Sequence, residues 1–306
     1  MERERRQRLE GRLVAAASVV VRRLPRRLAL ALGAGLARLY AAFDRRHVAV
    51  AEDNLRRAFP GWDAARVRRT ALGVYRHFGR VALDLLWMQG RGAEEVVKLC
   101  SFEHVERLDP VFARGKGSIM VSAHIGNWEV HAIAHGFRHA WAAVVARPLD
   151  NAALDERLVA LRAMSGNRVI SKHRALQDIL GYLRQNRMVA ILMDQNVQES
   201  DGIFVEFFGR PACTTTVAAA LAVKTGCGLV PVRTVLDPDG RYRLIYEPPL
   251  EWTPSGDRRA DIARLTQELT RVIEGWVRDT PEQWLWLHRR WKTQPENGAA
   301  AGELQP

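Results

Sequence analysis

Short apolar runs alternate with longer amphipathic segments after Gly90, and this alternation is typical of an α/β fold. Four runs are short enough for buried strands, and they lie at residues 117–123, 142–146, 188–193 and 229–233. The amphipathic segments predict helices at residues 127–139, 151–165, 174–186 and 214–225. Because strand and helix alternate, we expect a mixed, mostly parallel sheet flanked by helices. Residues 242–246 would add an antiparallel edge strand, and a last helix is expected near residues 261–278.

The chain before Gly90 has apolar positions at helical spacing. Residues 48–89 predict two helices separated by a stop at Pro60-Gly61. We therefore expect three parts. They are an N-terminal amphipathic helical membrane-associating segment (residues 1–47), a single α/β domain (48–292) and a flexible tail (293–306).

Positive charge is concentrated at the N-terminus. Residues 1–46 hold 12 arginines, no lysine and four acidic residues, and so carry +8 of the total net charge of +12. The apolar runs at 13–21 and 28–43 are shorter than the roughly 20 residues that span a bilayer. Acidic residues at the start and arginines after the first run disfavour a signal peptide. We expect helices lying in the membrane plane, with arginines at anionic head groups. Basic helices packed on their own domain are the alternative.

Composition excludes several classes of protein. With 306 residues, 47% hydrophobic and 26% charged, the chain is neither disordered nor a polytopic membrane protein. Three scattered cysteines are too few for a disulfide framework or a four-cysteine zinc site. No element for reading bases follows the basic segment, so a nucleic-acid partner is not expected.

Polar side chains follow three of the predicted strands. His124 comes after the first strand, Arg147 after the second, and Asp194 with Gln195 after the third. Ligands of open α/β sheets bind outside the carboxyl ends of the strands, so these residues are candidates for one site. A buried ion pair between Arg147 and Asp194 that braces neighbouring strands is the structural alternative.

His124 and Glu129 form the candidate catalytic pair. Five residues along a helix leave side chains about 140° apart. The two could meet only if His124 lies on the turn, which Gly126 permits, and Glu129 on the next helix, which Asn127 would cap. A carboxylate on one imidazole nitrogen leaves the other free as a base. The motif holds no serine or cysteine, so the nucleophile would be an incoming alcohol. The alternative is a capped helix beside a buried histidine.

The predicted helix after His124 carries His131, His135 and His139 at four-residue steps. A metal site is not expected, because the segment lacks the glutamate that a zinc protease uses as base. A helical wheel places Val130 and Phe137 on the core face and the histidines on the outer face. We interpret them as a solvated stripe.

Near the C-terminus, residues 283–292 interleave tryptophans with basic residues, Arg290 among them. Tryptophan at an apolar boundary with arginine for phosphates indicates a membrane-lipid surface. A terminal segment packed on the sheet would have the same composition.

Several motifs together resemble one family. They are Gly115-Lys-Gly-Ser-Ile-Met-Val-Ser-Ala-His-Ile-Gly-Asn-Trp-Glu129, Arg147-Pro148, Met193-Asp-Gln-Asn196, residues 205–209 and 212–214, residues 281–292, and Asn54-Leu-Arg-Arg-Ala-Phe-Pro60. From about residue 10 to 293 the chain resembles the bacterial late lipid A acyltransferases (the lauroyl/myristoyl branch) of the glycerolipid acyltransferase superfamily, with its His-x4-Asp/Glu motif.

The resemblance implies an O-acyltransferase at the cytoplasmic face of the inner membrane. It would move a fatty acyl chain from acyl carrier protein, or from acyl-CoA, to a hydroxyl of a lipid A precursor, with no other cofactor and no metal. It makes His124 the base, Glu129 its orienting partner and Arg147 an oxyanion or phosphate contact. Asp194 matches a further site position, and we add Asn127, Gln195 and Arg290 to the substrate-binding candidates.

Other activities stay open at this point. The acceptor could be another glycolipid, a phospholipid or an aminolipid. The chain could also be a non-catalytic lipid-binding protein at the membrane surface, or a hydrolase. Family members often begin with a longer apolar anchor. Here four arginines (Arg22, Arg23, Arg26 and Arg27) divide it, so monotopic association is expected.

Overall fold

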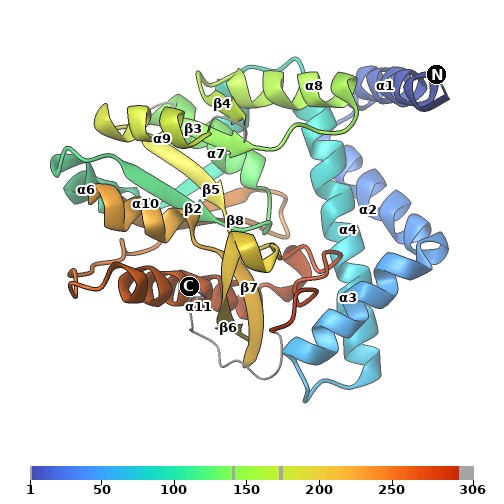
Figure 1. Cartoon of the computed structure of the whole chain (residues 1–306). Helices are drawn as coiled ribbons and strands as arrows, with labels where there is room; N and C mark the ends of the chain where they lie inside the picture. Colours follow the sequence, from blue (N-terminus) through green and yellow to red (C-terminus); the bar gives the residue numbers. More distant parts are fainter. Residues whose placement is uncertain (1, 140–141, 172–174, 296–306) are drawn as a thin grey trace.

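The computed structural model describes residues 2–139, 142–171 and 175–295. Its centre is a seven-stranded sheet in the order β1-β9-β8-β2-β5-β3-β4 (Figure 1). The strands are β1 (Cys100–Glu103), β2 (Ser118–Ser122), β3 (Ala142–Ala146), β4 (Arg168–Ser171), β5 (Met188–Leu192), β8 (Gly228–Leu236) and β9 (Tyr242–Tyr246). Only the β8–β9 pair is antiparallel. The predicted mixed, mostly parallel α/β fold is confirmed.

Helices cover both faces of this sheet. The α-helices are α1 (Glu2–Val21), α2 (Arg26–Phe43), α3 (Arg45–Ala58), α4 (Ala64–Met88), α5 (Ala93–Val97), α6 (Asp109–Ala113), α7 (Trp128–Arg138), α8 (Ala152–Ala163), α9 (Ala175–Arg184), α10 (Val217–Thr225) and α11 (Arg258–Asp279). One hydrophobic core includes residues of α9, α10 and α11, and a second includes residues of α5 and α7. The polar residues that follow β2, β3 and β5 therefore lie at the edge of a sheet between two packed layers.

The N-terminal helices form a layer of their own at the side of the sheet, with α4 next to the α/β domain (Figure 1). Helices α2 and α4 cross at Gly33 and Gly79, where a Cβ on either glycine would overlap the backbone of the other helix. Arg26 of α2 forms a buried ion pair with Asp84 of α4, at 2.6 Å. These contacts attach α2 firmly to α4.

The outer faces of α1 and α2 expose large apolar side chains among arginines. Ten large apolar side chains between residues 9 and 43 are exposed: Leu9, Leu13, Val19, Val20, Leu28, Leu32, Leu36, Leu39, Tyr40 and Phe43, the last 78% exposed. Among the described residues, no helix is both long enough and apolar enough to cross a bilayer.

Three features of the sheet differ from the sequence prediction. β9 is not an edge strand, because β1 pairs with it on its outer side. β1 and β4, each of four residues, were not predicted, because such short segments show no clear alternation. Residues that we identified only as motifs form a hairpin outside the main sheet, β6 (Gly202–Phe207) and β7 (Arg210–Thr215).

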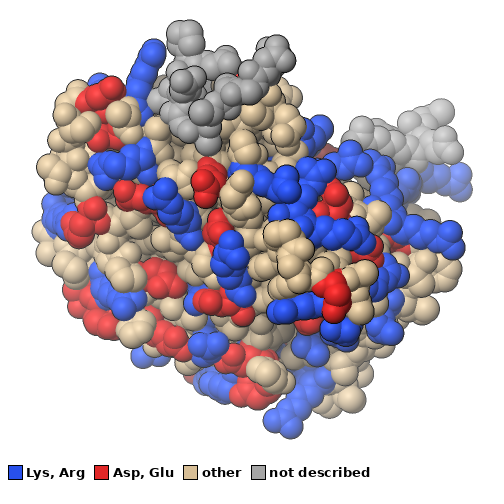
Figure 2. Space-filling view, turned by 90° about the horizontal axis from the view of Figure 1, so that it is seen from below, with Lys and Arg blue, Asp and Glu red and all other residues tan. Residues whose placement is uncertain are grey.

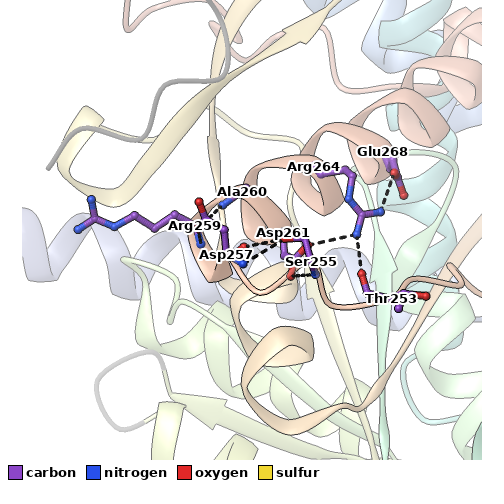
Figure 3. Close-up of polar contacts among 8 residues, drawn as sticks. All are labelled: Thr253, Ser255, Asp257, Arg259, Ala260, Asp261, Arg264 and Glu268. Atoms are coloured by element: carbon purple, nitrogen blue, oxygen red, sulfur yellow. Dashed lines mark hydrogen bonds and ion pairs between the residues drawn. The ribbon is translucent and has the colours of Figure 1, made fainter.

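The last helix begins earlier than predicted because its N-terminus is capped. The Asp257 carboxylate accepts hydrogen bonds from the backbone N–H groups of Arg259 and Ala260 (Figure 3). The Asp261 carboxylate accepts one from the Ser255 backbone at 3.0 Å. This cap starts α11 at Arg258 rather than near Asp261.

The C-terminal segment is part of the core rather than a lipid surface. Trp284, Trp286 and Trp291 are at most 5% exposed. The Asn54 amide donates hydrogen bonds to the carbonyls of Trp286 and His288. The interpretation of this segment as a membrane-lipid surface is therefore wrong. Thr293, which we assigned to the tail, is hydrogen-bonded to Asn196. Residues 296–306 of that tail lie outside the described part of the chain.

Candidate active site

His124 lies on a tight turn that several backbone contacts hold at the end of β2. Gly126 has φ +60°, and a Cβ at this position would overlap the Thr234 carbonyl oxygen, so only glycine fits. The Gly126 N–H donates to Gln283 O at 2.9 Å, and the Leu285 N–H donates to His124 O at 3.0 Å. The turn is thus fixed against residues 283–285, at the end of the 3₁₀ turn η4 (Pro281–Gln283).

The carboxylate that contacts His124 belongs to Asp194. Its Oδ1 lies 2.8 Å from His124 Nδ1, and its Oδ2 accepts the His124 backbone N–H at 2.9 Å. The Trp284 indole also donates to Oδ2, at 2.8 Å. β2 and β5 are parallel neighbours, so residues just beyond their carboxyl ends meet at one edge of the sheet. His124 and Asp194, which the sequence placed after the carboxyl ends of two strands, therefore meet in the structure as predicted for one site.

Burial and charge act in opposite directions on this pair. Burial alone would lower the pKa of His124, but Asp194, and at longer range Glu129, raise it above its ordinary value. Burial alone would raise the pKa of Asp194, but the charge and hydrogen bonds of His124, together with the Trp284 indole, lower it. Asp194 is therefore a carboxylate that stabilises an imidazolium at His124.

The second nitrogen of His124 faces a cavity of about 420 Å³. The Gln195 amide nitrogen lies 3.4 Å from His124 Nε2, and Gln195 also lines this cavity. Most of the lining is apolar and includes Met120, Ala132, Val144, Leu158, Ala190, Ile191, Leu192 and Val232. The arrangement is an imidazole, paired with a carboxylate, at the wall of a mostly apolar pocket, which is a geometry suited to a general base.

The predicted pairing of His124 with Glu129 is wrong. Glu129 lines the same cavity, but its carboxylate forms two hydrogen bonds with Arg162, at 2.6 and 2.7 Å. The Trp128 indole donates a third, at 3.0 Å. Glu129 is in the first turn of α7 and faces α8, whereas His124 turns toward β5.

Sequence reasoning missed Arg162, which is buried with Glu129 and lines the cavity. Burial alone would lower its pKa, but the Glu129 carboxylate raises it, so Arg162 stays charged. The sequence held one signal that could have identified Arg162: it lies four residues after Leu158, on the inward face of a predicted helix.

Arg147 lies at the rim of the cavity. Its side chain is 78% exposed, and its guanidinium contacts Asp150 at 3.2 Å. Because Asp194 pairs with His124, the alternative of a buried Arg147–Asp194 ion pair is wrong. A phosphate contact remains compatible with this position, as guanidinium groups bind phosphate well.

Asn127 and Arg290 do not line the cavity, contrary to their assignment as substrate-binding residues. Asn127 caps α7 as expected, since its side-chain oxygen accepts the Val130 N–H, and its amide donates to the Tyr242 hydroxyl. Arg290 donates to the Cys213 carbonyl at 2.8 Å, and burial lowers its pKa to about 10. Both residues hold the fold together from inside.

The predicted solvated stripe is wrong for His131 and His135, whereas His139 is exposed as predicted. His131 and His135 are at most 3% exposed, whereas Phe137 is 49% exposed. Their Nδ1 atoms contact Thr234 and Tyr246, and burial lowers the pKa of each histidine to about 3. α7 packs against α5 as well as the sheet, so a one-sided helical wheel did not apply. Among the described residues, no group of three or more His, Cys, Asp or Glu side chains is placed to hold a metal ion.

Comparison with known proteins gives consistent results. A family model described as "Bacterial lipid A biosynthesis acyltransferase" matches residues 4–293. The lipid A biosynthesis lauroyltransferase of Escherichia coli (strain K12) is 29% identical over 286 residues, which is 90% of this chain and 89% of that protein. The palmitoleoyltransferase of the same strain is 25% identical over 86% of this chain and 85% of its own length. A phosphatidylinositol mannoside acyltransferase of Mycobacterium tuberculosis (strain CDC 1551 / Oshkosh) is 27% identical over 66% of this chain and 67% of its own.

Proposed function

The chain belongs to the bacterial lipid A biosynthesis acyltransferase family and is an acyltransferase, and on this premise we propose that it acylates a hydroxyl of a lipid A precursor. The donor is the thioester of acyl carrier protein. The observation that carries the proposal is the His124–Asp194 pair at the wall of an apolar cavity. The name of the mycobacterial relative supports a related glycolipid as the alternative acceptor.

His124 acts as the general base. With Asp194 accepting the hydrogen on Nδ1, Nε2 takes the proton of the acceptor hydroxyl while the oxygen attacks the thioester carbonyl. The tetrahedral intermediate then collapses, the C–S bond breaks, and the imidazolium returns the proton to the departing thiolate. An ester and a free thiol are the products. A positioned base of this kind contributes about 10²–10⁴-fold in rate.

Two polar groups assist at different places. The Gln195 amide, 3.4 Å from His124 Nε2 and on the cavity wall, is the donor that we assign to the developing oxyanion. Arg147 at the rim binds a phosphate of the substrate, since its exposed guanidinium is available there. The Glu129–Arg162 pair shapes the cavity wall between α7 and α8.

We propose that the enzyme attaches to the cytoplasmic face of the inner membrane, and the exposed apolar side chains of α1 and α2 support this proposal. Their exposed leucines, valines and aromatics suit insertion at the acyl boundary, and their arginines suit anionic head groups. Lys and Arg side chains also gather on the right of Figure 2, the side on which Figure 1 draws α1–α4. Such an attachment is monotopic.

Reconstitution tests the proposal. The full chain is mixed with acyl carrier protein carrying a lauroyl thioester and with a purified tetra-acylated lipid A precursor. Thiol release and the mass of the lipid are followed together. We expect one added acyl chain per acceptor and loss of both signals in His124→Ala. The control is His139→Ala, an exposed histidine outside the cavity, which should retain activity.

The alternatives give different products. Free fatty acid without acylated lipid would show a hydrolase. Stoichiometric lipid binding without thiol release would show a non-catalytic lipid-binding protein. Either result would refute acyl transfer to this acceptor.

A further inference from the structure

A second cavity, of about 370 Å³, lies between α1 and α8. Helix α1 contributes Ala15, Ser18 and Val19, and Arg22 follows in the next turn. α8 and its C-terminal cap contribute Arg157, Ala160, Leu161 and Met164. Both sets have the spacing i, i+3, i+4 and i+7 of one helix face. The helices touch near Gly11, where a Cβ would lie 2.9 Å from that of Ala153. Beyond this contact they leave a groove.

The floor of the groove is the chain just after α4. Gln89 accepts hydrogen bonds from the Ser18 hydroxyl at 2.9 Å and from the Arg157 guanidinium at 3.0 Å. Gly90 has φ +82°, and Arg22 Nη1 lies 2.5 Å from the position that a Cβ would take there. The guanidinium groups of Arg157 and Arg22 therefore approach two consecutive residues, Gln89 and Gly90.

This convergence leaves positive charge without a counter-ion. Among residues 2–139, 142–171 and 175–295, no carboxylate forms an ion pair with Arg22 or Arg157. Two like charges near one apolar groove repel each other, and an anion between them relieves the repulsion. The site thus combines a cationic end with an apolar channel.

We propose that this groove binds an anionic phospholipid, with its phosphate between Arg22 and Arg157 and one acyl chain along Ala15, Val19 and Leu161. A lipid is the occupant because Val19, which lines the groove, is itself 40% exposed, so the groove opens beside the exposed apolar side chains of α1. A chain that leaves the groove continues onto these side chains. The volume falls within the range of about 300–1,000 Å³ that is usual for small-molecule sites.

The groove is separate from the catalytic cavity. α8 lies between the two, with Leu158 and Arg162 lining the catalytic cavity and Arg157 and Leu161 lining the groove. The bound phospholipid is therefore neither acyl donor nor acceptor. It fixes α1 to α8 at the membrane, and its binding does not depend on the proposed reaction.

Native mass spectrometry of the detergent-purified full chain tests this site. The protein is titrated with dimyristoyl phosphatidylglycerol and, as the zwitterionic comparison, dimyristoyl phosphatidylcholine. We expect a 1:1 adduct that is at least tenfold tighter with the anionic lipid. The double variant Arg22→Gln/Arg157→Gln should weaken that adduct at least tenfold and remove the head-group preference.

Matched controls separate the groove from general attraction. Arg23→Gln/Arg27→Gln removes the same charge from nearby arginines outside the groove and should leave affinity within twofold. Equal loss in both double variants would overturn the proposal, and so would unchanged binding in Arg22→Gln/Arg157→Gln.

Filling the groove gives a second test without a change of charge. Ala160→Trp should abolish the adduct, whereas Ala16→Trp, on an exposed part of α1 outside the groove, should not. Thermal melting checks that both variants fold. If Ala160→Trp does not fold, the arginine variants alone test the proposal. The adduct should persist in His124→Ala even if no acyl transfer is found. Binding that survives in folded Ala160→Trp would place the lipid elsewhere and overturn the proposal.

Discussion

Replacing Asp194 by asparagine removes the charge that orients His124 and keeps the size of the side chain. In the native site the Asp194 carboxylate accepts three hydrogen bonds, two from His124 and one from the Trp284 indole. The oxygen of asparagine can still accept the backbone and indole N–H groups. Its amide NH₂ then faces His124 Nδ1 as a donor.

This reversal changes the tautomer of the imidazole. Nδ1 must now accept a hydrogen bond, so the proton moves to Nε2, the nitrogen that faces the cavity. An Nε2–H cannot take a proton from an incoming hydroxyl. In Ser-His-Asp enzymes the corresponding change costs about 10⁴-fold in kcat, so we expect Asp194→Asn to lose about 10³–10⁴-fold.

The assay is the initial rate of thiol release from lauroyl-acyl carrier protein in the presence of the lipid acceptor. Asp53→Asn is the control, because Asp53 is an exposed carboxylate on α3 that pairs only with Arg57 among its described contacts. Thermal melting verifies that Asp194→Asn is folded. A folded Asp194→Asn protein with more than a tenth of the native rate would refute the role of this carboxylate.

Four further predictions concern pH, the second ion pair and the rim. The base must be neutral, so kcat/KM should rise with pH through a His124 pKa above 6.5, and a flat profile from pH 5 to 9 would contradict this. Because the pKa of His124 is raised in the folded state, this side chain also contributes to stability. The contribution is complete below pH 6.5 and is lost as the pH rises through the folded-state pKa of His124. Urea unfolding at several pH values measures this loss. Glu129→Gln leaves Arg162 buried without its charge partner and should lower the unfolding free energy by about 3–5 kcal/mol. The double variant Glu129→Gln/Arg162→Met should recover part of this loss. Equal stability of the native protein and Glu129→Gln in urea would show that the ion pair is unimportant. Arg147→Ala should raise KM for the lipid acceptor several-fold with kcat and melting temperature unchanged, because the side chain is exposed at the rim; an unchanged KM would exclude a phosphate contact.

Sequence alone predicted the sheet and the edge where the candidate site lies. The β2, β3, β5 and β8 strands have strong apolar runs, and the chemistry-bearing residues follow directly after three of them. Short strands such as β1 and β4 lack that signal, because their pairing partners rather than their own pattern define them.

The pairing of side chains could not be predicted from spacing. His124 and Asp194 are 70 residues apart, and only the adjacency of β2 and β5 brings them together. Nearness in the sequence, with a turn at Gly126, suggested Glu129, whose hydrogen-bonded partner, Arg162, comes from a different helix. The predicted solvent exposure of His131 and His135 was wrong for a similar reason, because their burial depends on α5 and the sheet behind α7.

The most direct test of the central claim is the acceptor dependence of thiol release in the native protein and in His124→Ala. With His124 as the base for the acceptor hydroxyl, thiol release in the native protein should require the lipid acceptor and match the acyl chains gained by it, one for one. In folded His124→Ala, acceptor-dependent release should fall to background. Native-like, acceptor-dependent release by this variant would contradict the account.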